Sequence, residues 1–485
     1  MGMAQHIHAS YRPRPDWNSI KWKKVGARVK KLQMRIAKAV REGRYRLAKS
    51  LQWLLTQSFY AKLVAVRRVV TNKGRYTPGV DGKLWNTPRK KMRAVELLTR
   101  RGYKPLPLRR VYIRKKNGTH RPLSIPTMRD RAMQTLYALA LAPVAETTGD
   151  LNSYGFREYR SCADAIEQCF VCLGRSNSAR WVLEADIKAC FDSINHEWMQ
   201  RNILMDRKML QAWLKAGYVE KGRLYPTKDG TPQGGVISPL LANMTLDGLE
   251  AVIGRAVPRG SKVNVIRYAD DFVVTGESKE ILRGKVIPAI QAFLTPRGLQ
   301  LSREKTRITR IEQGFDFLGQ HLRKYGGKCI IIPSHGAVKA LLAKTRKTIK
   351  NGLDHSVWTL IEELNSVLRG WANYHRHICS KQTFSHVDSR IFEQLWKGVA
   401  RKHGSKAKGW IRKKYFRSIP SRNWSFFATR KTESGTRESI DLFHTVTTKI
   451  VRHTKIRSVA NPYDKDWQEY FLTRKMLKYS ESVRV

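Results

Sequence analysis

Two adjacent acidic residues between two apolar segments limit the folds that are open to this chain. Residues 263–268 and 272–276 are rich in β-branched and aromatic residues, and Ala269, Asp270 and Asp271 lie between them. This pattern predicts a β-hairpin with the acids at its tip, although Asp is also common in ordinary β-turns. Neighbouring carboxylates repel each other and are costly to bury, so the hairpin favours a bound cation. Carboxylate oxygens are typical ligands of hard divalent ions such as Mg²⁺.

A third acid ends another predicted strand. Residues 181–186 form a mostly apolar run that ends at Asp186. If both strands lie in one sheet, Asp186 and Asp270 can face each other and hold two metal ions between them. Two ions roughly 3.5–4 Å apart can activate an attacking hydroxyl and stabilise the leaving oxygen of a phosphoryl transfer. The two strands together therefore indicate a two-metal site.

The net charge of the chain indicates a polyanionic partner. Its 485 residues include 93 Lys and Arg against 38 Asp and Glu, which gives a formal net charge of +55. Such an excess opposes compaction, and it is spread over the whole chain, so a large nucleic acid fits best. A membrane surface is the weaker alternative, because no run of about 18 apolar residues occurs. The length and the apolar content predict two to four packed domains.

The cysteines and the N-terminus bear on the compartment. Among six cysteines, Cys169 and Cys172 form a lone C-x-x-C pair without a second pair or nearby histidines. We therefore expect free thiols in a reducing cytosol and no zinc site. The first ten residues contain no signal-peptide core, so we expect a cytoplasmic protein. A basic transit peptide, and with it an organellar location, stays an open alternative.

Two basic regions precede the acid-bearing strands. Residues 17–70 have apolar residues at helical spacing together with basic faces, and a TPGVDG turn at residues 77–82 interrupts the helical pattern. Residues 108–126 are predicted to form two strands joined by a turn that contains Asn117 and Gly118, a strong hairpin signal. This hairpin is strongly cationic, which suits contact with a dense anion such as a triphosphate.

Three further motifs identify a family. They are SYGFR at residues 153–157, TPQGGVISPLLAN at 231–243 and LRGWANYH at 368–375, and the second lies between the two acid-bearing strands. Together with the acidic hairpin, they resemble the group II intron-encoded reverse transcriptase/maturase family over nearly the whole chain. Two positions depart from the family pattern, because Arg114 stands where proline is usual and the Pro-Gly turn expected after Arg157 is missing.

The resemblance implies an α+β fold of the right-hand polymerase type. It would have basic fingers, a palm with an antiparallel sheet, a three-helix thumb and a small C-terminal DNA-binding domain. The implied boundaries are a basic N-terminal helical extension at 1–90, fingers and palm at 91–333, the thumb or maturase domain at 334–403 and the DNA-binding domain at 404–485. We expect no zinc-bearing endonuclease, because only a short basic tail without cysteine follows residues 461–467.

The resemblance also assigns the catalytic centre. Asp186 and Asp270 would bind two Mg²⁺ ions, with Ile187 as a further metal-binding position. Asp271 would support the site electrostatically. The attacking group would be the 3′-hydroxyl of a primer, and the reaction would be nucleotidyl transfer.

Five residues are expected around the incoming nucleotide. Lys115 and Arg121 would hold the triphosphate, the arginine through bidentate pairing and the lysine as a point charge. Phe191 would lie under the sugar and disfavour a 2′-hydroxyl, or else be an ordinary core residue. Gln233 would lie over the nucleotide or the templating pair. Lys305 would lie near the pyrophosphate, where a plain surface lysine is the alternative.

Contacts with nucleic acid are expected in the last third of the chain. The thumb motif mixes apolar anchors with cations and aromatic residues, and the region from residue 404 interleaves cations with aromatic residues. Bases stack on aromatic rings while cations follow phosphates, although a small hydrophobic core would use the same rings. The expected contact residues are Arg369, Trp371, Tyr374, His375, Lys413 and Lys414.

The implied activity is RNA-directed DNA synthesis from dNTPs. As a maturase, the protein would also bind its own group II intron RNA in a ribonucleoprotein, assist splicing and support intron insertion into target DNA by target-primed reverse transcription. Two alternatives stay open. One is an RNA-binding splicing cofactor with a relic polymerase site, and the other is a domesticated reverse transcriptase in repair or defence.

Overall fold

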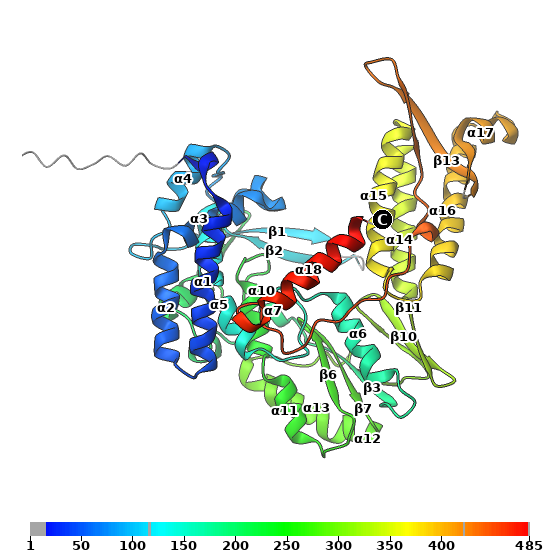
Figure 1. Cartoon of the computed structure of the whole chain (residues 1–485). Coiled ribbons are helices and arrows are strands. Elements are labelled where there is room, and N and C mark those ends of the chain that lie inside the picture. The colour runs from blue at the N-terminus through cyan, green and yellow to red at the C-terminus, as the bar shows by residue number, and fades with distance from the viewer. Residues whose placement is uncertain (1–15, 115–117, 421, 484–485) are drawn as a thin grey trace, which may run out of the picture.

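The computed structural model describes residues 16–114, 118–420 and 422–483. In Figure 1 the N-terminal helices lie on the left, a mixed region of helices and strands lies in the centre, and a helical unit lies on the right. Within the described ranges, no helix is both long and apolar enough to span a membrane. The short elements are η1 (Trp17–Ser19), η2 (Lys73–Tyr76), α12 (Lys279–Ile281), η3 (Leu282–Val286), η4 (Thr295–Arg297), η5 (Thr445–Thr447) and η6 (Lys465–Trp467).

In the described residues before β1 (Leu108–Arg114), four α-helices follow one another. They are α1 (Trp22–Arg41), α2 (Tyr45–Gln57), α3 (Phe59–Thr71) and α4 (Pro88–Glu96). On α1 the apolar residues recur at helical spacing, so Val25, Val29 and Ile36 enter the main core while most cations stay outside. Helices α1, α2 and α3 pack against α5 (Met128–Thr148).

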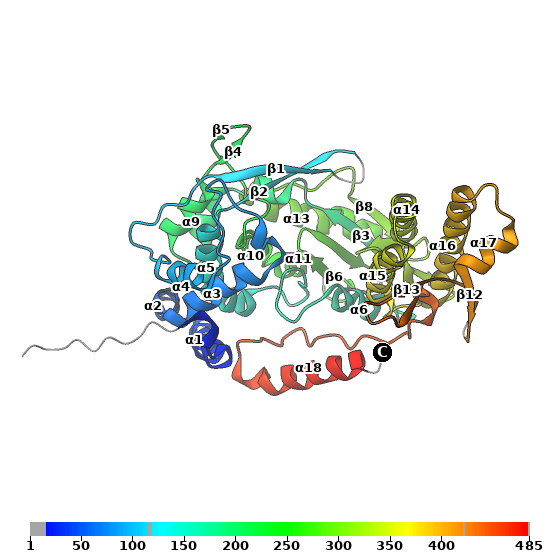
Figure 2. The same ribbon diagram turned by 90° about the horizontal axis from the view of Figure 1, so that it is seen from above.

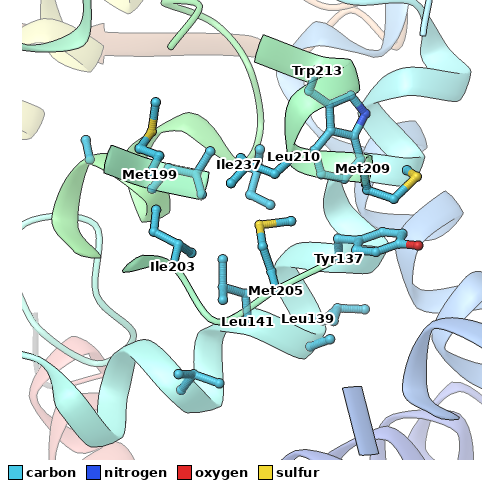
Figure 3. Packing of buried hydrophobic residues seen from close by; sticks show 14 of the residues in the cluster. Tyr137, Leu139, Leu141, Met199, Ile203, Met205, Met209, Leu210, Trp213 and Ile237 are labelled. Atoms are coloured by element: carbon cyan, nitrogen blue, oxygen red, sulfur yellow. The ribbon is translucent and has the colours of Figure 1, made fainter. Parts of the chain in front are cut away.

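The core around α5 holds the N-terminal helices and the central region together. Figure 3 shows side chains of α5 meeting those of α8 (His196–Asn202) and α9 (Arg207–Leu214). A chain of hydrogen bonds lies within this core, in which Trp213 Nε1 donates to the Tyr103 hydroxyl at 3.0 Å and that hydroxyl donates to Asp130 Oδ1 at 2.6 Å. The central helix is therefore fixed by both apolar packing and buried hydrogen bonds.

The fingers contain a four-stranded sheet. Its strands are β1 (Leu108–Arg114), β2 (His120–Ile125), β4 (Tyr218–Glu220) and β5 (Arg223–Tyr225). Strands β1 and β2 pair antiparallel, which is the hairpin that the sequence predicts, and β4 joins β1 in parallel. The guanidinium of Arg110 lies 3.7 Å from the ring centroid of Tyr218, so part of the cationic surface is supported by an aromatic ring.

The palm contains a second four-stranded sheet, in the order β6-β7-β3-β8. The strands are β6 (Asn264–Tyr268), β7 (Asp271–Gly276), β3 (Trp181–Asp186) and β8 (Arg307–Arg310), and all neighbours are antiparallel. One face of the sheet packs on α10 (Ser238–Leu246), α11 (Leu249–Ala256) and α13 (Ile287–Leu294), and the other packs on α6 (Cys162–Leu173). Both faces are covered, which explains the apolar runs within β3, β6 and β7.

A small sheet leads from the palm to the thumb. It consists of β9 (Phe315–Phe317), β10 (Gln320–Tyr325) and β11 (Lys328–Pro333). The thumb follows as three helices, α14 (His335–Gly352), α15 (Val357–His375) and α16 (Lys381–Lys402). Ser334 caps α14 by accepting a hydrogen bond from the amide of Ala337, which ends the strand and begins the helix.

Residues 404–443 pack on the thumb. Helix α17 (Lys408–Tyr415) and the strands β12 (Phe416–Ile419), β13 (Arg422–Lys431) and β14 (Arg437–Asp441) form this part. Tyr415, Phe416 and Phe426 share one hydrophobic core with the thumb helices. The expected alternative, in which aromatic residues of this region build a core, therefore holds for these three.

The remaining C-terminal residues return to the palm. We call residues 444–467 the strap, and it is followed by α18 (Gln468–Val483). The strap is anchored to the thumb where Thr445 donates to Asp388, and to the N-terminal region where Asp464 pairs with Arg41. Figure 2 shows the strap and α18 along the margin of the molecule opposite to β1 and β2, with the palm between them. The sequence predicts one unit over residues 404–485, and the structure divides those residues between two places.

Candidate active site

The acidic hairpin has the geometry that the sequence predicts. Tyr268 pairs with Asp271 across β6 and β7, which leaves Ala269 and Asp270 as the two-residue turn. Ala269 has a left-handed backbone with φ of 60°. Gly155 lies against this turn so closely that a Cβ on it would be 2.5 Å from the nitrogen of Ala269. The SYGFR motif therefore supports the turn, and only glycine permits that approach.

The palm sheet brings the third acid to the same place. Asp186, at the end of β3, pairs in register with Asp271, at the start of β7. Burial and the negative charge of Asp186 raise the pKa of Asp270. Loss of hydration, together with the charges of Asp186 and Asp270, raises the pKa of Asp271 to about 7, although that residue is exposed. The three carboxylates thus repel one another, and a cation would relieve this repulsion.

A lysine lies beside the carboxylates. Lys305 Nζ donates to Asp186 Oδ2 at 2.8 Å, and the lysine side chain is 66% exposed. The hydrogen bond to Asp186, together with the charges of all three acids, raises the pKa of Lys305. The ammonium group of Lys305 therefore supplies one positive charge beside the acids. Because its side chain is exposed, it can also reach an anionic ligand.

The donor set fits Mg²⁺ bound together with a substrate. Among the described residues, no group of three or more His, Cys, Asp or Glu side chains is arranged to hold a metal ion by itself. Asp186 and Asp270 remain as a two-carboxylate pair, and Mg²⁺ commonly uses one or two carboxylates together with waters and phosphate oxygens. The side chain of Ile187 is 2% exposed and apolar, so only its backbone carbonyl can serve as a ligand.

The fingers present one predicted cation to the acids. Arg121 is exposed on β2, and its charge acts on Asp270 in the direction that lowers the pKa of that carboxyl. A triphosphate between the hairpin of the fingers and the palm would therefore meet this guanidinium. Lys115, the second predicted phosphate ligand, lies outside the described residues.

Phe191 and the TPQGG motif are joined by backbone hydrogen bonds. Phe191 lies in α7 (Cys190–Ser193), and its carbonyl accepts from the amide of Thr231 at 2.6 Å. The ring is half-buried against the main core, so both expected roles, contact with a sugar and core packing, stay compatible with its position. Gln233 Nε2 donates to Asp192 Oδ2 at 2.8 Å, and this hydrogen bond ties the glutamine side chain to α7.

The same motif is tied to the fingers. The amide of Ser124 in β2 donates to the carbonyl of Gln233 at 2.7 Å. Gly234 has φ of 107°, and a Cβ on it would lie 2.7 Å from the carbonyl oxygen of Ser124. This contact links the strand that bears Arg121 to the motif that bears Gln233, so the two predicted nucleotide ligands are positioned together.

A buried ion pair supports the acidic hairpin and was not anticipated from the sequence. Arg267, in the middle of β6, is 1% exposed, and its Nη2 lies 2.5 Å from Asp247 Oδ1. Burial, in spite of the attraction of Arg267, raises the pKa of Asp247 to about 6. The carbonyl of Arg267 also accepts from the amide of Tyr154. An arginine within an otherwise apolar strand is the signal that would have indicated such a partner.

The predicted thumb residues differ in their access to solvent. Arg369 is exposed and lies 5.2 Å from the ring centroid of Phe443, and the Tyr374 hydroxyl donates to the carbonyl of Leu318. Trp371 is half-buried and packs on the ring of His375. His375 is only 1% exposed, and burial together with nearby His377 lowers its pKa to about 4.

The buried position of His375 does not fit the predicted contact with RNA. We assign it instead to the packing between Trp371 and Tyr374, whose ring centroids lie 4.7 and 4.8 Å from that of His375. Lys413 and Lys414 are exposed on α17, and Lys414 Nζ lies 4.6 Å from the ring centroid of Trp410. These two lysines are accessible to a phosphate backbone.

The fold and the acidic cluster define a right-hand polymerase of the reverse transcriptase class. Residues 113–322 match the family described as reverse transcriptase (RNA-dependent DNA polymerase), and residues 17–98 match the N-terminal domain of reverse transcriptase. Residues 338–416 match the maturase-specific domain of group II introns. The chain belongs to the group II intron-encoded reverse transcriptase/maturase family.

Several individual proteins are similar to this chain to different extents. Protein YkfC of Escherichia coli is 34% identical over 340 residues, which cover 58% of this chain and 88% of that protein. The group II intron-encoded protein LtrA of Lactococcus lactis is 28% identical over 428 residues, which cover 73% and 70% of the two chains. A solved structure of telomerase from Candida albicans with a fragment of telomeric RNA aligns at a TM-score of 0.37 and 12% identity, over 66% of this chain and 63% of that chain.

Proposed function

We propose that this protein is an active RNA-directed DNA polymerase, in which a primer 3′-hydroxyl attacks the α-phosphate of a dNTP and releases pyrophosphate. The observation that supports it best is the register of the palm sheet, which places Asp186 opposite Asp271 with Asp270 in the adjoining turn. Neither Asp186 nor Asp270 is buried, so a primer end has access to both. A relic site would have no reason to keep three mutually repelling carboxylates together.

Asp186 and Asp270, with the carbonyl of Ile187, would hold two Mg²⁺ ions. When bound, such ions lower the pKa of the attacking hydroxyl and stabilise charge on the leaving oxygen. Asp271 adds negative charge beside this pair without itself being a required ligand. Its pKa of about 7 would fall when divalent cations bind, because their positive charge favours the ionised carboxylate.

The other predicted residues would bind and orient the nucleotide. Arg121, together with Lys115, would hold the triphosphate through charge-assisted hydrogen bonds. Lys305 would leave Asp186 for the departing pyrophosphate and donate a proton to it. Phe191 would pack under the sugar, and Gln233, held by Asp192, would lie over the nucleotide or the templating pair.

As a maturase, the protein would bind its group II intron RNA and support insertion of the intron by target-primed reverse transcription. The net charge of +55 supports this additional role, because it exceeds what a primer and template alone would need. Arg369, Trp371 and Tyr374 of the thumb would contact RNA. Lys413 and Lys414 of α17 would contact the phosphates of target DNA.

Replacement of Asp270 tests the polymerase assignment. We expect Asp270→Asn to lower cDNA synthesis in a primer-extension assay by at least about 100-fold, because a metal ligand is lost while the shape of the turn is kept. The affinity for RNA, measured by filter binding on the same preparation, should stay within about twofold, since the turn contributes no phosphate contact.

Asp354→Asn provides the matched control. Asp354 is an exposed carboxylate in the loop after α14, so its replacement should leave both activities at the wild-type level. If Asp270→Asn still extends the primer normally, the site is wrongly assigned. If the wild type binds RNA but makes no cDNA, the protein is a splicing cofactor only.

A further inference from the structure

Residues of the strap line two cavities. One, of about 760 Å³, lies between the strap, the N-terminus of α6, the C-terminal end of α15 and α18. The other, of about 620 Å³, lies between the strap and α1. Arg160 lines both, so they are adjacent along the strap. Neither includes a residue to which the proposed polymerase reaction assigns a role, and the first includes Tyr374, for which we propose contact with intron RNA.

Positive charge dominates both cavities. The first is lined by six Arg and Lys residues and by no Asp or Glu. These cations are Arg160, Arg376, Arg452, Lys455, Arg457 and Arg474. The second is lined by Lys30, Lys31, Arg35, Lys38, Arg41 and Lys465, among other residues. Its two acids are already paired, because Glu146 contacts Arg157 at 2.7 Å and Asp464 pairs with Arg41.

The nearest buried acid does not neutralise the exposed cations of the strap. Asp164 is 0% exposed, and its Oδ1 accepts from His453 Nε2 and from Arg474 Nη2, each at 2.8 Å. These bonds fix the strap in place but use the inner cations only. Arg452 and Arg457, which line the first cavity, are exposed. The strap is therefore held by one set of charges and presents another set to solvent.

The first cavity also offers aromatic surface. Tyr268, Tyr374 and Tyr470 line it, and the guanidinium of Arg457 lies 5.5 Å from the ring centroid of Tyr470. Cations that follow phosphates and aromatic rings on which bases can stack are the combination that binds nucleic acid strands. The second cavity continues the positive surface toward the exposed cations of α1.

We propose that the strap and its two cavities form one track for the phosphate backbone of RNA, distinct from the site that binds the nucleotide and the primer end. We call this surface the basic track. Its walls belong to the segments that match the maturase-specific domain, through residues 373–377, and the N-terminal reverse transcriptase domain, through residues 27–41. These origins favour intron RNA over target DNA as the occupant. The inference rests on the proposed maturase function.

Neutralisation of exposed cations at each end of the track provides the test. The variants are Arg452→Ala/Arg457→Ala at the first cavity and Lys31→Ala/Arg35→Ala at the second. Each residue is exposed, so the fold should be kept. The probe is a labelled group II intron transcript, and its dissociation constant is measured by filter binding over a range of salt concentrations. Primer extension on a short unstructured template is measured with the same preparations.

We expect each double variant to bind the transcript about tenfold more weakly and to reduce the slope of log affinity against log salt by about two, one for each lost phosphate contact. Primer extension should stay within about twofold of the wild type. The control is Arg283→Ala/Lys285→Ala, which removes two exposed cations from η3, away from the strap, and should change neither quantity.

Three results would overturn the basic track. The first is an unchanged salt slope in both double variants. The second is an equal loss of primer extension, which would assign the surface to the primer–template path. The third is a loss of affinity for a DNA duplex without any loss for the transcript. Failure of the wild-type protein to bind the transcript is a different result, because it would contradict the proposed maturase function itself.

Discussion

Gly234 lies against the fingers where the TPQGG motif meets β2. Its φ of 107° and the 2.7 Å between a Cβ placed on it and the Ser124 carbonyl oxygen leave no room for a side chain. We predict that Gly234→Ala displaces Gln233 from β2 and lowers kcat/KM for dNTP incorporation by about 100-fold, because small displacements of positioning groups are costly. Single-nucleotide extension kinetics measure this effect.

A substitution at Gly222 serves as the control, because it tests backbone strain without a steric conflict. It has φ of 80°, but a Cβ on it would meet no atom within 4 Å. Gly222→Ala should therefore carry similar backbone strain and leave extension kinetics within about threefold of the wild type. Equal losses in both variants would show that strain alone is responsible and would remove the argument for a tight contact at Gly234.

At the residue scale, the sequence predicts the groups that motifs mark and misses the groups that support them. The meeting of Asp186 with the acidic turn follows from two apolar runs that each end in an acid. The buried pair between Arg267 and Asp247 does not, because its partners come from different elements and only the fold brings them together. For His375, the motif predicts contact with RNA, whereas the packing of α15 buries the side chain.

At the scale of elements, the strap is held by one buried carboxylate. Ser161, His453, Ile456 and Arg474 all donate to Asp164, and these bonds lower the pKa of Asp164 to about 2 in spite of its burial. A carboxyl with a depressed folded-state pKa stabilises the fold above its unfolded value of about 3.9, and this stability is lost as pH falls toward 2. Asp164 is therefore ionised at neutral pH, where its hydrogen bonds hold the strap in place.

We predict that Asp164→Asn loosens the strap. Removing one partner from a buried ionic cluster costs about 3 kcal/mol or more, because cations are left without compensation. Hydrogen exchange at the amide of Ile456, which donates to Asp164 Oδ1, should accelerate by about 100-fold or more through local opening. The measurement is hydrogen exchange followed by mass spectrometry of peptides that span the strap.

An exposed Asp–His pair offers the comparison for that variant. Asp316 Oδ1 lies 2.7 Å from His321 Nδ1, and the aspartate side chain is 50% exposed. Asp316→Asn should leave exchange in the strap unchanged. Wild-type exchange at Ile456 in Asp164→Asn would mean that apolar contacts of Ile456 and Phe471, rather than the carboxylate, fasten this segment.

Elements with strong periodicity are predictable from the sequence, and the strap is not. The fingers hairpin follows from strand-forming residues and a turn signal over a short window, and the three thumb helices follow from the resemblance to the family. The strap shows neither the helical nor the strand spacing of apolar residues. Its contacts with Asp164 and Asp388 join it to residues that lie far away in the chain. The division of residues 404–485 between thumb and palm is therefore a property of tertiary contacts alone.

At the scale of the whole molecule, the proposed site of chemistry and the proposed surface for RNA lie apart. Three acids lie at the end of the palm sheet, whereas the cations of the strap and α1 lie along another margin (Figure 2). The net charge of +55 is the sum of such surfaces and favours the binding of polyanions, while we expect the acids to determine where divalent metal binds.

The proposed polymerase activity requires Asp186 and Asp270 to hold the divalent ions together. The most direct measurement counts Mn²⁺ by electron paramagnetic resonance in a complex with a dideoxy-terminated primer, its RNA template and the next dNTP. We predict two bound ions in the wild type and in Asp354→Asn, and the loss of at least one ion in Asp186→Asn and in Asp270→Asn. An unchanged count of two in both of these variants would contradict the proposal that Asp186 and Asp270 hold the ions.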